Sequence, residues 1–257
     1  MGIDCIIQAR LGSTRLHGKV LKEIKGKSLI KYCLDQISKS KLIHRVIVAS
    51  TTNPNDAPLI EKVKEYGYEV FAGSENDVLD RYYQAAKKFN SEIIVRVTSD
   101  CPLIDPTIVD KVIQTFKEEN ADYASNVQPP SFPDGLDVEV FTFDALERSW
   151  KEAKMKSERE HVTLYIWNYQ EKFKMINVLN DEDLSHLRIT VDETEDFELV
   201  SKIIEIIDKE IIYFEDIKEL FKKNPELAKI NSKFSRNEGM AKSIREDEIV
   251  NNKMNEG

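Results

Sequence analysis

Short apolar runs alternate with amphipathic stretches along the first half of the chain. The runs are rich in β-branched residues, which predicts buried strands, and the stretches between them repeat apolar positions at helical spacing. The predicted strands are Ile3 to Gln8, Arg45 to Ser50, Glu69 to Phe71, Glu92 to Val97 and Asp122 to Ser125. The predicted helices cover Leu29 to Ile37, Asp56 to Tyr66, Asn76 to Phe89 and Pro106 to Glu119.

Strands that alternate with helices at this spacing form βαβ units. Such units build a mainly parallel sheet with helices on both faces. Ligands then bind beyond the carboxyl ends of the strands. We therefore expect functional residues to follow strands and not to precede them.

The second half of the chain has a different pattern. Gln128 to Gly135 is a proline-rich loop, and Leu136 to Thr142 then alternates as a strand does. Further predicted elements are helices at Phe143 to Ala153, Ser157 to Asn168 and Glu193 to Ile207, and a strand at Leu187 to Val191. Charged and Asn residues dominate after that, so we expect one domain over residues 1–222 and a mobile or weakly helical extension over residues 223–257.

The charge balance and the cysteines restrict the classes of function. The chain has 257 residues and a net charge of −9, whereas a protein that coats nucleic acid needs a basic face. Its three cysteines are widely spaced and form no C-x-x-C pair, which is typical of buried thiols in a reducing cytoplasm. No run approaches the roughly 20 apolar residues of a membrane helix, and the first is too short for a secretory signal. We expect a cytoplasmic protein with no nucleic-acid or membrane partner.

The first predicted strand runs directly into the loop Ala9 to Lys19, which reads A-R-L-G-S-T-R-L-H-G-K. Gly and Ser let backbone N–H groups approach phosphate oxygens, and Arg10, Arg15 and Lys19 supply positive charge. The spacing excludes a Walker A motif, because five residues separate the two glycines and no Ser or Thr follows the lysine. The place of the loop after the first strand favours a phosphate site over a flexible basic turn.

Two acidic residues follow later predicted strands. Asp100 lies in T-S-D-C-P-L, and Asp192 lies in V-D-E-T-E-D-F. Carboxylates at this edge of a sheet can hold Mg²⁺ together with substrate phosphates. Alternatively, Asp100 could cap the helix near Pro106, and the acidic residues around Asp192 would suit a helix N-terminus.

Further polar residues lie around the proline-rich loop and after it. Asp137 and Glu139 alternate and so share one face of a strand, where they could bind sugar hydroxyls or amines, or face solvent at a sheet edge. Ser157 and Glu160 have the spacing of a capping box. His161 follows them and could face an anionic substrate, although a lone histidine is more often structural.

Together these motifs resemble the cytidylyltransferase family that activates acidic sugars such as acylneuraminate and KDO, and within it the SpsF-like spore coat polysaccharide biosynthesis proteins. The phosphate loop, S-D-C-P-L-I-D-P from Ser99 and V-D-x-x-E-D-F from Val191 recur in the same order. G-S-E-N-D-V-L-D-R-Y from Gly73, P-D-G-L-D-V-E-V-F from Pro133 and S-E-R-E-H-V-T from Ser157 also match. The resemblance covers roughly residues 3–205.

The resemblance implies a fold and an activity. The fold is a Rossmann-like three-layer α/β sandwich with a mainly parallel mixed sheet, of the nucleotide-diphospho-sugar transferase type. The activity is Mg²⁺-dependent transfer of CMP from CTP to an acidic sugar or a related phosphorylated acceptor, with release of pyrophosphate. Members act in surface polysaccharide or glycoconjugate biosynthesis and are often homodimers.

The resemblance also assigns residues to roles. Catalysis would involve Arg10, Lys19, Asp100 and Asp192, and the two aspartates would bind the metal. The nucleotide would contact Ala9, Arg10, Leu11, Gly12, Ser13, Arg15, Lys19, Gly73, Ser74, Asp77 and Ser99. The acceptor would contact Asp134, Asp137, Glu139, Glu160 and His161. Asp192 or a metal-bound water is the candidate general base.

One position departs from the family pattern. The family loop usually reads R-L-P-G-K, and here His17 replaces the proline. Proline fixes φ near −65°, so the loop with His17 is less preorganised and gains a possible donor. We expect altered nucleotide affinity and retained activity.

Two other classes of function compete with this interpretation. A glycosyltransferase that uses a nucleotide sugar on the same fold would usually carry a D-x-D metal motif, whereas Cys-Pro follows Asp100. A non-catalytic relative would have lost the cations of the loop or the two aspartates, and all of them are present.

Overall fold

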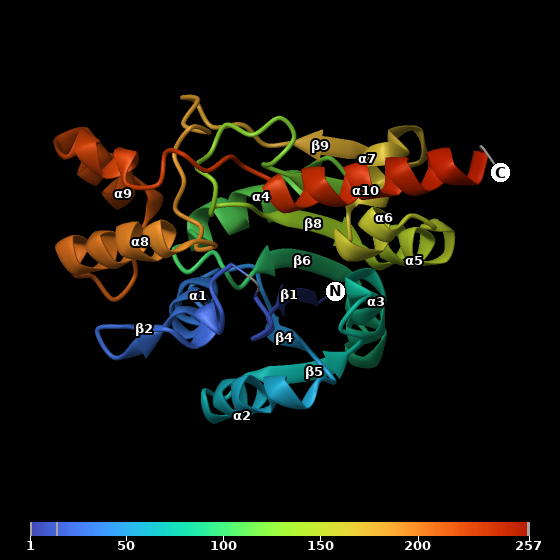
Figure 1. Cartoon of the computed structure of the whole chain (residues 1–257), viewed down its shortest axis with the longest axis horizontal. Helices are drawn as coiled ribbons and strands as arrows, with labels where there is room; N and C mark the ends of the chain where they lie inside the picture. The colour runs from blue at the N-terminus through green and yellow to red at the C-terminus, as the bar shows by residue number, and fades with distance from the viewer. Residues whose placement is uncertain (1, 14, 256–257) are drawn as a thin grey trace.

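A seven-stranded sheet forms the centre of the computed structural model, which describes residues 2–13 and 15–255 (Figure 1). The strands lie in the order β5-β4-β1-β6-β8-β7-β9. Their bounds are β1 Ile3–Gln8, β4 Arg45–Thr51, β5 Glu69–Gly73, β6 Ile93–Thr98, β7 Tyr123–Ser125, β8 Glu139–Thr142 and β9 Met175–Asn177. The strands from β5 to β6 are parallel to one another, whereas β8 runs antiparallel to both of its neighbours. The predicted mainly parallel mixed sheet is confirmed.

Side chains of the central strands alternate between two hydrophobic cores, one on each face of the sheet. In β1, Cys5 and Ile7 belong to one core and Ile6 to the other, as the two-residue period of a strand requires. The first core is covered by α1 Leu29–Ile37, α2 Ala57–Glu65, α4 Pro106–Glu118, α8 Thr194–Ile207 and α9 Phe214–Lys223. The second is covered by α3 Val78–Phe89, α5 Phe143–Glu152 and α7 Leu164–Asn168. The structure is therefore the expected three-layer α/β sandwich.

The shorter elements connect these layers. A small hairpin, β2 Glu23–Ile24 with β3 Lys27–Ser28, is separate from the main sheet. The 3₁₀ turns are η1 Lys19–Leu21, η2 Pro54–Asp56, η3 Gln170–Lys172 and η4 Pro225–Lys229, and the remaining helices are α6 Lys156–Glu160 and α10 Glu238–Asn255. All three cysteines are buried and free, as predicted.

The strand predicted at Leu187 to Val191 is wrong. The segment is buried, but its one sheet-like contact is an isolated bridge between Arg188 and Asp134. Its backbone donors bond to loop carbonyls instead of a neighbouring strand: Ile189 N–H donates to Asp134 and Val191 N–H to Asp100. The alternating apolar residues of this segment reflect its burial. Its backbone N–H donors are satisfied without hydrogen bonds to a neighbouring strand.

The single helix predicted at Ser157 to Asn168 is also wrong. It divides into α6 and α7, because Val162 adopts φ +49° in the left-handed region between them. The predicted capping box of Ser157 and Glu160 is absent too. Instead, the Glu158 carboxylate accepts a hydrogen bond from the Met155 backbone N–H, so the helix begins one residue earlier than expected.

Residues after 222 pack on the sandwich more closely than their composition suggested. Leu227 belongs to the first core, and the Asn231 side chain is 2% exposed and donates to the Arg188 carbonyl. Beyond them lies α10, which runs alongside α6 (Figure 1). The division into 1–222 and 223–257 stays a prediction, but much of the second part is helical and attached to the first.

Gly135 allows a close contact between two backbones beside the bridge at Asp134. Its φ is +111°, and a Cβ there would lie 2.6 Å from the Thr190 nitrogen and 2.8 Å from the Ile189 carbonyl carbon. Gly135→Ala should therefore lower the free energy of unfolding by more than the roughly 1–3 kcal/mol typical of backbone strain alone. Gly67→Ala is the matched control, because Gly67 has φ +83° with nothing within 4 Å of a Cβ. Equal losses for both variants in urea unfolding would contradict this prediction.

Candidate active site

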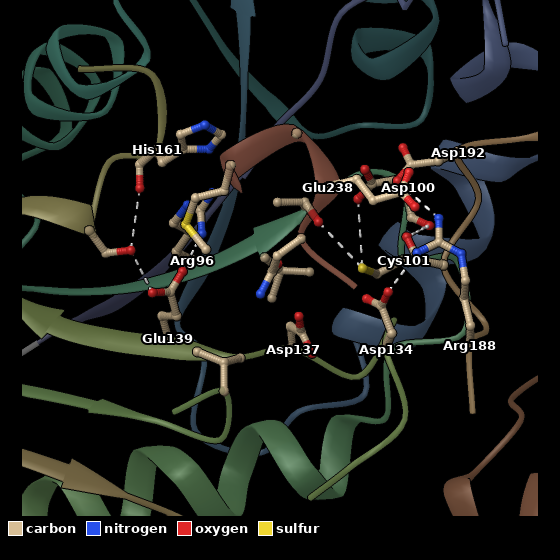
Figure 2. Close-up of a pocket in the computed structure, with 18 of the residues that line it drawn as sticks. Arg96, Asp100, Cys101, Asp134, Asp137, Glu139, His161, Arg188, Asp192 and Glu238 are labelled. Atoms are coloured by element: carbon tan, nitrogen blue, oxygen red, sulfur yellow. Dashed lines mark hydrogen bonds and ion pairs between the residues drawn. The ribbon is translucent and has the colours of Figure 1, made fainter. Parts of the chain in front are cut away.

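Two adjoining cavities lie at the edge of the sheet where β1 and β6 end. The larger, of about 660 Å³, is lined by the loop after β1 and by Ser99 after β6. The smaller, of about 220 Å³, is lined by Asp134, Asp137 and Glu139 among others. Figure 2 shows the smaller cavity with these side chains around it. Residues that line both cavities include Arg15, Thr98, Asp100, His161 and Asp192.

The loop after β1 forms one side of the larger cavity. Of the residues predicted to contact the nucleotide, those that line it are Ala9, Arg10, Gly12, Ser13, Arg15, Lys19 and Ser99. Leu11 does not line it; its N–H donates to Asp56 at 2.6 Å, and its carbonyl accepts from Ser13 and Gly18. Gly18 closes the loop with φ +62°, a conformation that glycine adopts without strain. His17 is exposed and lines neither cavity.

Lys19 lines the larger cavity and contacts two residues, Asp100 and Asp192, that line both cavities. Its side chain is buried, and its ammonium donates to Asp100 Oδ2 at 3.2 Å, Asp192 Oδ1 at 2.7 Å and the Val191 carbonyl at 2.7 Å. Burial alone would lower the pKa of this lysine, but the two carboxylates raise it above the ordinary value. Lys19 is therefore a fixed positive charge between the loop and the two predicted metal ligands.

Asp100 is free to act in the site because a different residue caps α4. The cap is Asp105, whose Oδ1 accepts from the backbone N–H of Thr107 at 2.6 Å. Burial alone would raise the pKa of Asp100, but Lys19 and the Thr98 hydroxyl hold it below the ordinary value. Asp100 thus presents a charged carboxylate to both cavities.

Asp192 is held by further cations besides Lys19. Arg15 approaches Asp192 Oδ1 at 3.0 Å, and Arg188 approaches Oδ2 at 3.2 Å. Arg188 also donates to Asp134 at 2.7 Å and, through two atoms, to the fully buried Asp196 at 2.9 Å each. Asp196 caps α8 by accepting from the N–H groups of Asp192 and Glu193. The helix-cap interpretation is therefore correct for Asp196, and Asp192 projects into the cavities.

Glu139 is an interior residue, so the alternative of a solvated edge strand is wrong. Its side chain is on β8 directly opposite Arg96 of β6, and the two form an ion pair. The same carboxylate accepts from the hydroxyls of Tyr123 and Thr163 at 2.6 Å each. Glu139 lines the smaller cavity, but its oxygens are already occupied by these partners, and it fixes the wall of the cavity.

Asp134 and Asp137 lie among other charged side chains around the smaller cavity (Figure 2). Asp137 pairs with Arg236, a residue of the C-terminal segment. Burial raises the pKa of Asp137 to about 7, against the lowering effect of Arg236, and Asp134 and Glu139 add to the rise. Burial also raises the pKa of Asp134, despite the nearby positive charges of Arg236 and Arg188. A hydrogen-bond donor on the acceptor substrate would therefore bind strongly to either of these two carboxylates.

His161 and Glu160 meet at the boundary of the cavities. The Ser243 hydroxyl donates to Glu160 at 3.0 Å and lies 3.1 Å from His161 Nε2. Burial lowers the pKa of His161, so its ring is neutral near pH 7. Both residues line the larger cavity, and His161 also lines the smaller one.

Gly73, Ser74 and Asp77 do not line either cavity. Asp77 is the N-cap of α3, and its Oδ2 accepts from Arg159 at 2.6 Å and 2.9 Å. The Ser74 hydroxyl accepts from the Asp77 N–H at 3.1 Å. These residues form a tight turn at the end of β5, and their assignment to nucleotide binding stays a prediction.

Three arginines that neutralise the site were not predicted from the sequence. Arg96, Arg188 and Arg236 each pair with a predicted site carboxylate. Arg96 had a signal, because it is a charged residue within an otherwise apolar strand. Arg188 had the same signal, because it interrupts the apolar pattern of the strand predicted at Leu187 to Val191. Arg236 had none, because its partner lies 99 positions away.

The carboxylates of the site meet part of the ligand requirement of a magnesium ion. In the described part of the chain, no group of three or more His, Cys, Asp or Glu side chains could hold a metal ion. Mg²⁺ needs fewer protein ligands, because it is usually bound by one or two carboxylates plus substrate phosphates and water. Asp100 and Asp192 both accept from the Lys19 ammonium, which occupies the point between those two oxygens. The two carboxylates are therefore close enough together to bind one ion beside the ammonium, and their assignment as metal ligands stays a prediction.

Comparison with known proteins agrees with the geometry. A family model described as cytidylyltransferase matches residues 5–238. An uncharacterized protein of Methanocaldococcus jannaschii is 39% identical over 234 residues, which cover 90% of this chain and 95% of that protein. The spore coat polysaccharide biosynthesis protein SpsF of Bacillus subtilis is 31% identical over 205 residues, which cover 77% of this chain and 84% of that protein. A solved cytidylyltransferase structure from Leptospira borgpetersenii has a TM-score of 0.86 and 36% identity, covering 89% of this chain and 97% of the other.

None of the helices in the described residues combines the length and the apolar composition that a bilayer crossing requires.

The buried pair of Arg188 and Asp196 provides a test of how the site is held together. Asp196→Asn leaves Arg188 without its main partner and should lower the free energy of unfolding by about 3–5 kcal/mol near neutral pH. Burial alone would raise the pKa of Asp196, but its bonds to Arg188, Asn231 and the backbone hold it below the ordinary 3.8. The stability from this carboxylate is therefore present above that value and lost as pH falls through the lower, folded-state pKa.

Urea unfolding of wild type and variant over a range of pH checks this. The difference in stability should shrink as the pH falls below about 4. Glu198→Gln, on the exposed face of the same helix, is the control and should change little. A constant difference at every pH would show that the pair does not carry the stability.

Proposed function

The chain belongs to the cytidylyltransferase family, and from this we propose that it transfers CMP from CTP to an acidic sugar or a related acceptor, with release of pyrophosphate. One observation carries the proposal. The buried Lys19 ammonium joins Asp100 and Asp192 where the larger and smaller cavities meet. Two substrates bound one in each cavity would react at that junction.

The larger cavity suits the nucleoside triphosphate. Arg10, Arg15 and Lys19 all line it, so three cations face the space in which phosphates would lie. Gly12 also lines this cavity and adds no side chain there. Backbone N–H groups of the loop can therefore approach phosphate oxygens closely.

The smaller cavity suits a polar acceptor. It is lined by carboxylates that accept from hydroxyl or amino groups and by the guanidinium groups of Arg15, Arg96 and Arg188. A molecule with both a carboxylate and several hydroxyls can satisfy both kinds of group. The relative SpsF, named for spore coat polysaccharide biosynthesis, supports an acceptor of sugar type and a role in making surface polysaccharides.

The reaction requires one bond to form and one to break. An oxygen of the acceptor attacks the α-phosphorus of CTP, the bond from that phosphorus to the bridging oxygen breaks, and pyrophosphate leaves. Arg10 and Lys19 would stabilise the charge that builds on the leaving group, an electrostatic effect that is strong in a site shielded from water. Asp192 lines both cavities, so it is placed to accept the proton of the acceptor hydroxyl. A bound Mg²⁺ ion, held by Asp100 and Asp192, would polarise the α-phosphate.

A glycosyltransferase remains the alternative on this fold. The family match disfavours it, and release of pyrophosphate from CTP separates the two activities, because a glycosyltransferase consumes a nucleotide sugar instead. The homodimer and the cytoplasmic location that the resemblance implies stay predictions.

Removing either side of the central ion pairs should abolish most of the activity. Asp100→Asn and Lys19→Ala should each lower pyrophosphate release from CTP with Mg²⁺ by about 100-fold or more, the usual cost of one electrostatic donor in such a site. The assay would screen acylneuraminate, KDO and sugar phosphates as acceptors and use the best of them. Asp181→Asn and Lys39→Ala, at exposed positions outside both cavities, are the matched controls. Near-normal release by both site variants would refute the assignment.

The choice of nucleotide can be tested without an acceptor. With MgCl₂ present, CTP at about 100 times its Kd should stabilise the protein by about 2.7 kcal/mol in a thermal shift assay. ATP, GTP and UTP at the same concentration should give smaller shifts. The CTP assignment fails if another triphosphate stabilises the protein and CTP does not.

A further inference from the structure

Residues 235–247, which we call the C-terminal strap, form a wall of both cavities. Ser235, Asn237 and Met240 line the smaller cavity, and Lys242, Ser243 and Glu246 line the larger one. Glu238 and Gly239 line both. Figure 2 shows Glu238 among the side chains that surround the smaller cavity with Asp100 and Asp137. Most of the strap lies beyond residue 238, where the family match ends.

Polar contacts connect the strap to the residues that bind the substrates in the proposed function. Arg236 pairs with Asp137 and donates to the Phe132 carbonyl at 3.0 Å. Ser243 donates to Glu160 and lies within hydrogen-bonding distance of His161. The contacts at Asp137, Glu160 and His161 therefore end on residues that line a cavity.

Two further contacts join the strap to α6. The Asp247 carboxylate accepts from the Ser157 backbone N–H at 2.9 Å, and Lys156 lies 3.6 Å from Glu246. Among the described residues, neither hydrophobic core includes a residue after Ile230. A segment held by polar contacts and few apolar ones opens locally at low cost in free energy.

We propose that the C-terminal strap is the closing element of the active site: it covers bound nucleotide and acceptor together, and Arg236 and Ser243 position Asp137 and the Glu160–His161 pair. The small volume of the acceptor cavity agrees with this. At about 220 Å³ it lies below the roughly 300–1,000 Å³ of most ligand pockets, and the strap is the part of its wall least anchored to the cores. The inference rests on the proposed function, because the ligands that the strap covers are those of that reaction.

The strap divides its contacts between the two substrates. Asp137 lines only the smaller cavity, so Arg236 acts on the acceptor side, whereas Ser243 and Glu160 line only the larger one. Loss of one charge-assisted hydrogen bond at Asp137, in Arg236→Gln, should raise the KM for the acceptor about tenfold and leave the Kd of CTP within about twofold. Arg236→Lys should recover part of the lost acceptor affinity. Ser243→Ala, in contrast to Arg236→Gln, should weaken the binding of CTP.

Hydrogen exchange of the wild-type chain with CTP and MgCl₂ tests the closure directly. At about 100 times the Kd of CTP, segments that must release the nucleotide in order to open should exchange up to about 100-fold more slowly. We expect this protection in the loop of residues 9–19 and also in the strap. Helix α9, which lies outside both cavities, serves as the internal reference. Arg245→Gln, on the exposed side of the strap, should behave as wild type.

The possible outcomes separate the two proposals. Protection of both segments supports the strap. Protection of the loop alone, or an unchanged acceptor KM in Arg236→Gln, overturns the proposed role of the strap and leaves the proposed function in place. Protection of neither segment overturns the proposed function and the strap with it.

Discussion

The buried ammonium of Lys19 is the interaction on which the site depends. It contacts Asp100 after β6 and the segment that ends at Asp192, two regions separated from it by 81 and 173 positions. An ammonium removed from water is costly unless acceptors surround it, so the loop after β1 is stable only when both regions are in place. The site and the sheet therefore form together. This explains why the chain tolerates three cations in one loop: the acids that balance them arrive with the fold.

The acceptor side of the site obeys the same rule with the charges exchanged. There carboxylates are buried and arginines neutralise them: Arg96 at Glu139, Arg188 at Asp134 and Arg236 at Asp137. The register of the sheet places the first pair directly opposite each other on β6 and β8. Such a network orients its oxygens before any ligand arrives, which reduces the reorganisation needed during binding.

How much of the molecule can be predicted from sequence depends on the range of the forces involved. Strands such as β1 and β4 were predicted closely, because a buried strand shows itself in consecutive β-branched residues. Ala9 to Lys19, Asp100 and Asp192 were found because a parallel sheet brings the loops after its strands to one edge. The strand at Leu187 to Val191 was predicted wrongly because burial leaves the same apolar pattern whether or not a ladder forms. Arg236 was missed because its partner is 99 positions away, and Arg188 because its three partners come together only in the fold. The helix break at Val162 was missed because a β-branched residue rarely adopts a positive φ.

The reversed direction of β8 has an effect beyond topology. Asp134 and Asp137 precede the strand and Glu139 begins it, contrary to the rule expected for a parallel sheet. The reason is that an antiparallel strand begins at the edge where its neighbours end. The nucleotide half of the site is thus built from turns that come after strands, and the acceptor half from a segment that comes before one. The two halves can therefore diverge separately. Substitutions before β8 can change the acceptor specificity during evolution, while the residues that bind the triphosphate stay the same.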